Sequence, residues 1–187
     1  MNIVYACEWE KNRKSTWSGT SYSILSALEK RVNVHEVDLT MNLFEKVILS
    51  VFSCRIRNNR VRIDKSCRPL TIFYKQKKLE FLLSEKNAIP KLIIGDFGKV
   101  KNGYYYIDLT VGALLYFRKY YPEMARWANL NEIPDEDLKI RNKYQLEILD
   151  NARGIFTMSK WLAEYLIAQE GFSKNKIYYV GGYEPKH

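Results

Sequence analysis

The segment "GIFTMSKWLAEYLIAQEGFSKNKIYYV", residues 154–180, decides the predicted fold, because it contains one complete strand–helix–strand unit. Its apolar runs at 154–159 and 176–180 predict two buried strands. Ser159 is a residue type preferred at a helix N-cap, and Gly171 is one preferred just beyond a helix end. A helix that connects two strands in this way is typical of parallel pairing. The segment therefore predicts a parallel sheet.

The same alternation of strands and helices runs through the rest of the chain. Apolar or alternating runs predict further strands at 2–7, 32–39, 60–64, 90–98 and 103–108. Helical periodicity and end signals predict helices at 20–30, 40–54, 69–87 and 109–121, and one more that begins at Pro134. Strands this apolar are buried on both sides, which requires helices on both faces of the sheet. We therefore expect an α/β fold with a Rossmann-like parallel sheet, built as a single domain from residues 1–187.

The cysteines and histidines show no pairing. Cys7, Cys54 and Cys67 are odd in number and lack metal-ligand spacing, which is typical of reduced thiols in the cytoplasm. His35 lies within a predicted strand, His187 is the last residue, and neither has a His or Cys at ligand spacing, so we expect no metal site. The sequence has no run of 18 apolar residues, and its first residues lack the basic region of a signal peptide. A cytoplasmic location is therefore expected.

The net charge of +9 is concentrated in residues 53–78, which contain nine Lys or Arg and one acid, Asp64. Just before this stretch, apolar residues repeat at helical spacing at Phe44, Val47, Ile48, Val51 and Phe52. One interpretation is a basic surface for anionic lipid headgroups, acidic polysaccharide or nucleic acid. The other is a solvated loop and helix face. A nucleic-acid partner is not expected, since the basic stretch has no interleaved aromatic residues before Phe73 and no recognisable binding motif.

Candidate site residues follow the predicted strands, because ligands of parallel sheets bind at the carboxyl ends of the strands. Gly19 and Thr20 come after the first strand, Asp96 after "KLIIG", Asp108 after "GYYYI" and Ser159 after "GIFTM". Most of them have a structural alternative as well, although Asp96 and Asp108 both follow strands that end at one crevice. The glycine can simply satisfy a turn, Ser159 can cap its helix, and Asp108 can cap the helix that follows it.

Three segments resemble, in order, the N-terminal domain of GT-B glycosyltransferases, specifically glycosyltransferase family 4 (group 1). "NARGIFTMSKWLAEYLIAQEGFSKNKIYYVGGY" (151–183) is similar to the end of that domain, with Ser-x-Trp opening a helix, a closing Gly, and Lys-Ile-x-x-Val before a Gly-rich exit. "WSGTSYSI" (17–24) resembles the glycine of the first loop and the helix after it. "YIDLTVGALLYFRKYYPE" (106–123) resembles a strand that ends in a polar residue before a Phe/Leu-rich helix and a Tyr-Pro. Residues 40–90 carry no resemblance.

The resemblance implies transfer of a sugar from a nucleotide-sugar to a hydroxyl of a glycan or lipid-linked acceptor, with retained configuration, no metal and no cofactor. Enzymes of that family have a second Rossmann-like domain, which makes most donor contacts and carries two glutamates eight positions apart. No two glutamates here have that spacing, and the chain ends five residues after "VGG". We therefore expect the acceptor-side half, with an interdomain linker at about 181–187 and a donor-binding domain in cis or in trans. The isolated chain is expected to transfer no sugar.

By the same resemblance, Gly19 and Thr20 would bind the departing diphosphate, Asp108 would face the reacting centre or the acceptor, and Ser159 would contact the acceptor or only cap its helix. Asp96, selected by its place after a strand, is expected to bind the acceptor. Two alternatives stay open at this point. One is a nucleotide-binding module on a Rossmann-like fold, since fold alone does not determine function. The other is a non-catalytic partner subunit.

Overall fold

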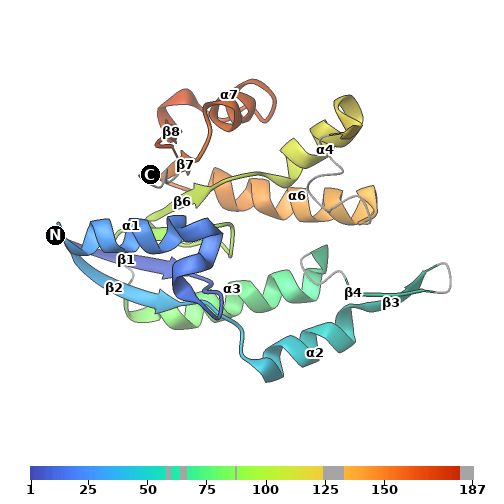
Figure 1. The fold of residues 1–187 in the computed structure, drawn as a ribbon, viewed down its shortest axis with the longest axis horizontal. Helices are drawn as coiled ribbons and strands as arrows, with labels where there is room; N and C mark the ends of the chain where they lie inside the picture. The colour runs from blue at the N-terminus through green and yellow to red at the C-terminus, as the bar shows by residue number, and fades with distance from the viewer. Residues whose placement is uncertain (58–59, 64–66, 87, 124–132, 182–187) are drawn as a thin grey trace.

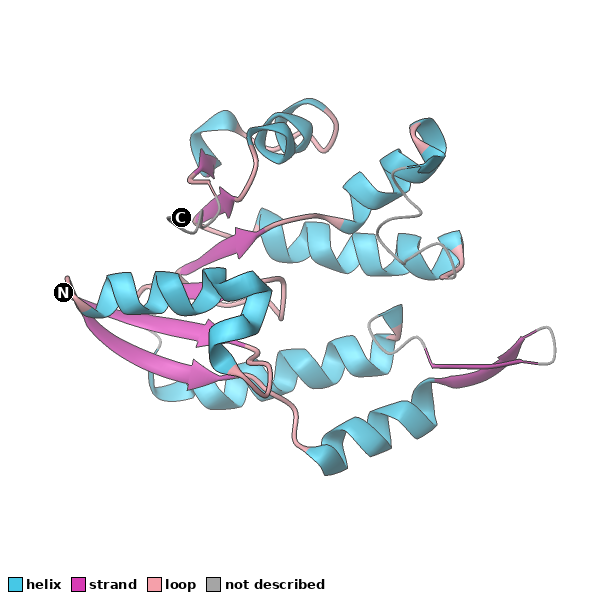
Figure 2. Ribbon diagram, viewed as in Figure 1, coloured by secondary structure: helices cyan, strands magenta, loops and turns pink. Residues whose placement is uncertain are grey.

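Six parallel strands form the central sheet in a computed structural model that describes residues 1–57, 60–63, 67–86, 88–123 and 133–181 (Figures 1 and 2). All neighbouring strands pair in parallel. Across the sheet the order is β2 (Asn33–Asp38), β1 (Asn2–Cys7), β5 (Lys91–Ile94), β6 (Gly103–Ile107), β7 (Gly154–Thr157) and β8 (Ile177–Tyr179). The predicted α/β, Rossmann-like parallel sheet is confirmed.

Three of the six α-helices in the described residues begin at a side chain that caps them. The α-helices are α1 (Thr20–Glu29), α2 (Leu43–Ser53), α3 (Pro69–Leu83), α4 (Val111–Tyr120), α6 (Asp135–Asp150) and α7 (Lys160–Ala168). The capping side chains are Asn42 for α2, Thr110 for α4 and Ser159 for α7. Short 3₁₀ helices cover η1 (Arg13–Gly19), η3 (Ser84–Lys86) and η4 (Lys174–Lys176). The helix expected over 40–54 begins only at Leu43, because the Asn42 side chain caps it. The helix expected over 69–87 ends at Leu83 and continues as the 3₁₀ turn η3, and residue 87 lies outside the described residues.

The two faces of the sheet are covered unequally. On one face, Val4, Ile93, Tyr105 and Ile155 belong to a large core that includes buried residues of α2, α3, α4, α6 and α7. On the other face, Tyr5, Leu92 and Tyr106 pack against α1, the one α-helix of the described residues with side chains in that cluster, and against Trp17 of η1. Helices on both faces are therefore confirmed. Beside α1, an apolar groove of about 670 Å³ extends over Tyr104 and Phe156.

A small antiparallel hairpin projects from the body beyond α2 (Figure 1). It consists of β3 (Cys54–Arg57) and β4 (Arg60–Ile63). The strand expected at 60–64 is present, whereas β3 was not predicted, although Arg55, Ile56 and Arg57 alternate as a strand does. The hairpin and α2 are continuous in the chain.

One buried ion pair joins the starts of two helices. Arg68, the residue before α3, lies 3.0 Å from the Asp137 carboxylate in the first turn of α6, and both side chains are at most 10% exposed. Acids in the first turn of α6 were expected from the sequence because they complement the positive end of the helix. The ion pair between Asp137 and Arg68, which lies in a distant segment of the chain, was not predicted from the sequence.

Of the expected linker at about 181–187, only Gly181 is described, and its carbonyl accepts a hydrogen bond of 2.9 Å from the Tyr106 hydroxyl. No helix of the described residues is long and apolar enough to cross a bilayer.

Candidate functional site

The order of the strands reverses between β1 and β5. The strand that follows β1 in the chain, β2, lies on one side of β1, and the next strand of the sheet, β5, lies on the other side of β1. The carboxyl ends of β1 and β5 therefore diverge, which leaves a crevice between them. A polar cleft of about 850 Å³ lies there, which we call the switch-point cleft. Acidic side chains lining it come from the ends of three strands: Glu8 after β1, Asp38 at the end of β2 and Asp96 after β5. This is the position at which parallel sheets bind ligands.

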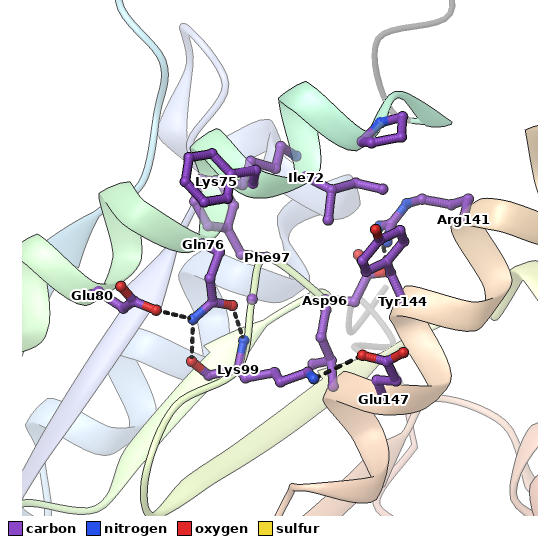
Figure 3. A pocket seen from close by; sticks show the side chains of 14 residues that line it. Ile72, Lys75, Gln76, Glu80, Asp96, Phe97, Lys99, Arg141, Tyr144 and Glu147 are labelled. Atoms are coloured by element: carbon purple, nitrogen blue, oxygen red, sulfur yellow. Dashed lines mark hydrogen bonds and ion pairs between the residues drawn. The ribbon is translucent and has the colours of Figure 1, made fainter.

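Asp96 separates the switch-point cleft from a second, smaller cavity of about 330 Å³ between α3 and α6, the α3–α6 cavity (Figure 3). Its carboxylate accepts a hydrogen bond of 2.7 Å from the Gln145 amide and forms an ion pair with Arg141, both on α6. The Gln145 oxygen in turn accepts the Val111 N–H at 2.7 Å. These contacts fix the orientation of the Asp96 carboxylate.

The walls of the α3–α6 cavity are held rigid by hydrogen bonds. The Gln76 amide on α3 accepts the Lys99 N–H at 2.7 Å and donates to the Lys99 carbonyl at 3.0 Å. Lys99 also pairs with Glu147 of α6 at 2.8 Å (Figure 3). A β-carbon at Gly98 would lie 2.7 Å from the Gln76 side-chain oxygen, so a larger residue there would displace this amide from its contacts with Lys99. Fixed polar groups of this kind can recognise hydroxyls without reorganising.

Two tryptophans line the switch-point cleft. Trp9 donates from its backbone N–H to Thr40 at 2.8 Å, and the Arg13 guanidinium lies 4.4 Å from the centre of its ring. The Trp17 indole packs over Gly95 at the end of β5, where a β-carbon would be 3.6 Å away. Trp9 is buried between Tyr5 and Arg13, so Trp17 is the tryptophan with a partly exposed ring in this cleft. A partly exposed indole beside several carboxylates suits a ligand that has both an apolar ring face and hydroxyls.

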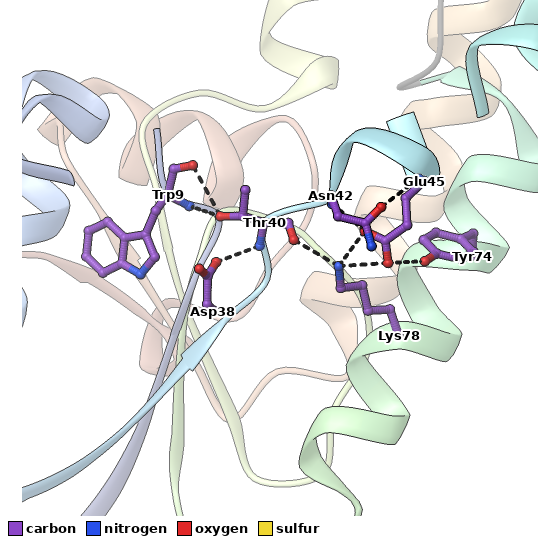
Figure 4. A network of polar contacts seen from close by, with 7 residues as sticks. All are labelled: Trp9, Asp38, Thr40, Asn42, Glu45, Tyr74 and Lys78. Atoms are coloured by element: carbon purple, nitrogen blue, oxygen red, sulfur yellow. Dashed lines mark hydrogen bonds and ion pairs between the residues drawn. The ribbon is translucent and has the colours of Figure 1, made fainter. Parts of the chain in front are cut away.

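Glu45 anchors α2 to α3 beside the cleft (Figure 4). It accepts hydrogen bonds from the Tyr74 hydroxyl, from Lys78 at 2.9 Å and from the Asn42 N–H at 2.6 Å. Burial alone would raise the pKa of Glu45, but the hydrogen bonds from Tyr74, Lys78 and Asn42 lower it. Lys78 also donates to the Thr40 carbonyl at 2.9 Å, so the network extends to a residue of the cleft.

Glu45→Gln is expected to lower the free energy of unfolding by about 1–2 kcal/mol, because it removes the charge that accepts these hydrogen bonds. The lowered pKa means that Glu45 stabilises the fold above the ordinary glutamate pKa, and that this contribution is lost as the pH falls through the lowered value. Thermal melts of both proteins from neutral to acid pH will test this. Their midpoints should differ at pH 7 and converge in acid; a difference that is constant across the range contradicts the assignment.

The predicted diphosphate residues lie on a left-handed turn. Trp17, Ser18 and Gly19 have φ of 51°, 54° and 89°, and no side chain caps α1, which begins at the next residue. Positive φ at the two non-glycine residues is strained backbone of the kind that concentrates at functional sites. Trp17 lines the switch-point cleft, whereas Thr20 lines the apolar groove beside α1. In the chain, Gly19 therefore lies between a residue of the cleft and a residue of the groove.

Asp108 does not cap α4. The N-cap is Thr110, whose hydroxyl accepts the Ala113 N–H at 3.1 Å, so the capping alternative for Asp108 is wrong. The Asp108 side chain reaches solvent, but partial desolvation by the surrounding protein raises the pKa of its carboxyl. The Asp96 carboxylate raises this pKa further. Hydrogen bonds from the N–H groups of Asp108 and Leu109 oppose this rise in part. The two aspartates are thus close enough to repel each other, although Asp108 lines neither the cleft nor the α3–α6 cavity.

Ser159 is the N-cap of α7, which is the structural alternative that the sequence offered for it. Its hydroxyl accepts the Leu162 N–H at 3.1 Å and caps α7. It lines neither the switch-point cleft nor the α3–α6 cavity. Contact with an acceptor stays a prediction for this residue.

Cys7 lies at the cleft but is unsuited to nucleophilic chemistry at neutral pH. Burial raises the pKa of its thiol to about 12, so the thiol stays protonated. Within the described ranges, no three His, Cys, Asp or Glu side chains are arranged to hold a metal ion.

Several residues of the site were missed in the sequence. Glu8 and Trp9 directly follow β1, and Asp38 ends β2, so the rule that selected Asp96 would have selected them too. Arg141 and Gln145 lie on the helix α6, far from Asp96 in the sequence. Their spacing of four residues places them on one face of a helix, and this spacing is the one feature of the local sequence that could have pointed to them as site residues.

The fold is similar to that of a solved structure, UDP-N-acetylglucosamine 2-epimerase from Rickettsia bellii. The TM-score is 0.53 at 14% sequence identity, and the match covers 97% of this chain and 45% of the epimerase chain. The chain thus spans slightly less than half the length of that enzyme, and the likeness supports a GT-B-like Rossmann fold. No family model matches the sequence, and no curated protein matches it significantly. Membership of glycosyltransferase family 4 stays a prediction.

Proposed function

We propose that the chain is the acceptor-side domain of an enzyme that acts on nucleotide-sugars, and that the reaction is retaining transfer of a sugar to a hydroxyl of a glycan or lipid-linked acceptor. The observation that carries the proposal is Asp96, an oriented carboxylate at the strand-order reversal, between the switch-point cleft and the α3–α6 cavity. A carboxylate held in one orientation is a strong acceptor for a sugar hydroxyl. The flanking Trp17, which is half-buried, offers an aromatic face for the sugar ring.

Catalysis in this proposal requires stabilisation of two charges. The transition state is cation-like at the sugar while a diphosphate departs. The Asp108 carboxylate would stabilise the positive charge, with Asp96 orienting the acceptor. The N–H groups at the start of α1, which no side chain caps, would bind the diphosphate next to Gly19. A donor-binding domain, in cis or in trans, would supply the remaining contacts to the nucleotide-sugar.

Binding to the cleft can be tested by NMR, because Trp9 and Trp17 line it and Trp161 does not. Methyl glycosides and UDP-, GDP- and ADP-sugars serve as probes, and the indole N–H signals report on binding. A glycoside that enters the cleft should shift the signals of Trp9 and Trp17 saturably, and Asp96→Asn should weaken the effect. Shifts confined to Trp161, or none with any probe, would overturn the assignment of the cleft.

The reaction itself is tested on the chain combined with its donor-binding domain. The same nucleotide-sugars are incubated with and without glycan and lipid-linked acceptors, and the products are identified by mass and NMR. A new glycosidic bond with retained configuration supports transfer. The epimerase likeness makes epimerisation the second candidate, and it would give a product of unchanged mass with altered sugar stereochemistry.

Gly19→Ala is expected to reduce turnover of that enzyme at least about tenfold, because a side chain at φ +89° distorts the turn that presents the α1 N–H groups. The backbone strain itself costs about 1–2 kcal/mol of stability. Gly171→Ala is the matched control, since Gly171 has φ +75° with open space around it, and it ends a different helix. Equal loss of turnover in both variants would show that Gly19 only satisfies the geometry of its turn and does not bind the diphosphate.

A further inference from the structure

The helix α2 presents its apolar side to solvent. Leu49 and Ser53 are buried against the body, whereas Phe44 and Phe52 are 73% and 69% exposed. The large exposed apolar side chains are Leu43, Phe44, Val47, Ile48, Val51 and Phe52. Their spacing of three and four residues places them in one stripe along the helix. A contiguous exposed stripe of this kind marks an interaction surface.

The hairpin that continues from α2 is divided into two faces by its register. Arg55 pairs with Arg62, and Arg57 pairs with Arg60. Alternate residues of a strand share a face, and so do directly opposed residues of paired strands. By this register the positions of all four arginines belong to one face of the ribbon, and positions 54, 56, 61 and 63 belong to the other. We call α2 and this hairpin the arm; it extends away from the body (Figure 1).

The positive charge of residues 53–78 divides between the arm and the body. The four bases in 68–78 form ion pairs within the body: Arg68–Asp137, Lys75–Glu8, Lys77–Glu80 and Lys78–Glu45. The other five of the nine bases lie in 55–65. The basic surface expected over 53–78 is thus reduced mainly to the hairpin.

We propose that the arm binds the surface of an anionic lipid bilayer. An apolar stripe that enters the boundary of the acyl chains, next to a basic face at the headgroup phosphates, is the combination that holds an amphipathic element in a membrane interface. A second copy of the chain would bring two strongly basic stretches together. A nucleic acid would match the arginines but leave the α2 stripe in water. The inference does not depend on the proposed function.

The arm offers a site for a reporter group. Cys54 is exposed at the junction of α2 and the hairpin, whereas Cys7 and Cys67 are buried, so a thiol-reactive fluorophore should label Cys54 selectively. The labelled chain is mixed with vesicles of phosphatidylcholine alone or with about 30% phosphatidylglycerol, and cosedimentation is measured in parallel. Blue-shifted emission and quenching by nitroxide lipids are expected with the anionic vesicles only. Raising NaCl from about 50 to about 500 mM should weaken the binding at least tenfold.

Two sets of variants separate the contributions of the arm. Reversing Arg57, Arg60 and Arg62 to Glu should abolish binding to anionic vesicles. The control with the same change of net charge reverses Lys30, Arg31 and Lys174, which are exposed outside the arm, and it should lose less than about threefold.

The apolar set replaces Phe44, Val51 and Phe52 with Ser. Because these side chains are exposed, the thermal midpoint should change little while binding to anionic vesicles falls about tenfold or more. Phe81→Ser with Tyr179→Ser is the control, since both residues are highly exposed outside the arm.

Four results would overturn the proposal. They are equal binding to neutral and anionic vesicles, unchanged binding in the arm variants, self-association in sedimentation velocity that the apolar set abolishes without any vesicle binding, and binding of RNA or DNA in place of vesicles.

Discussion

Asp137→Ala is expected to lower the free energy of unfolding by about 3–5 kcal/mol, because it leaves the Arg68 guanidinium buried without its carboxylate. Arg68 is only 6% exposed, so water cannot replace the lost partner. The corresponding fall in the thermal midpoint is roughly 6–20 °C for a chain of this size. Urea unfolding followed by circular dichroism would measure the free-energy change directly.

The effect can be assigned to burial with two comparisons. Glu164→Ala breaks the ion pair between Lys160 and Glu164, whose side chains are 78% and 65% exposed, and should cost less than about 1 kcal/mol. Replacing Arg68 with Met and Asp137 with Leu together removes both charges and should recover most of the loss. If Asp137→Ala lowers the free energy of unfolding no more than Glu164→Ala does, the buried ion pair does not stabilise the contact between the starts of α3 and α6.

Asp108→Asn is expected to lower turnover of the enzyme, with its donor-binding domain present, about 10²–10³-fold, because the carboxylate would stabilise the cation-like sugar. Its raised pKa also shifts the pH dependence: turnover should fall on acidification at a higher pH than the 3.8 of an unperturbed aspartate. Full steady-state kinetics against pH, for both proteins, would show this.

Stability gives an independent readout for the same variant. A carboxyl whose pKa is raised in the folded state stabilises the fold most below its unfolded pKa, and this contribution is lost as the pH rises through the folded value. Asp108→Asn should therefore leave the thermal midpoint at pH 7 unchanged or raise it on the order of 1 °C, because solvent screens an exposed carboxylate. Near-normal turnover, or a clear fall in the midpoint, would return Asp108 to a structural role.

The sheet could be predicted from the sequence because its strands are short, nearly continuous apolar runs. "NIVYAC" and "KLIIG" can only be buried, and the helices between them carry recognisable end residues at Pro69 and Ser159. The direction of the α2 stripe could not be predicted, since helical spacing of Phe44 and Phe52 is the same whether the stripe faces the core or the solvent.

The site was predicted in outline only. The carboxyl-end rule found Asp96 because strand ends are visible in the sequence. Its partners Arg141 and Gln145 come from a helix far along the chain, and their contact depends on how α6 packs against the sheet. The sequence leaves capping open as an alternative for Asp108, because Asp and Thr both cap helices and residues 108 and 110 lie two positions apart; the structure shows Thr110 as the cap.

The pairing of β1 with β5 has a consequence for biosynthesis. These two strands lie side by side in the middle of the sheet, yet all of residues 8–90 must be translated between them. At about 5–20 residues per second, a ribosome takes about 4–17 s to make that segment. During this time β1 has only β2 beside it, too small a unit to fold alone, and the apolar side of α2 has already been made. Nascent chains arrested before Lys91 has left the ribosome should therefore be protease-sensitive and bound by chaperones, and protection should appear only after β5 and its neighbours emerge.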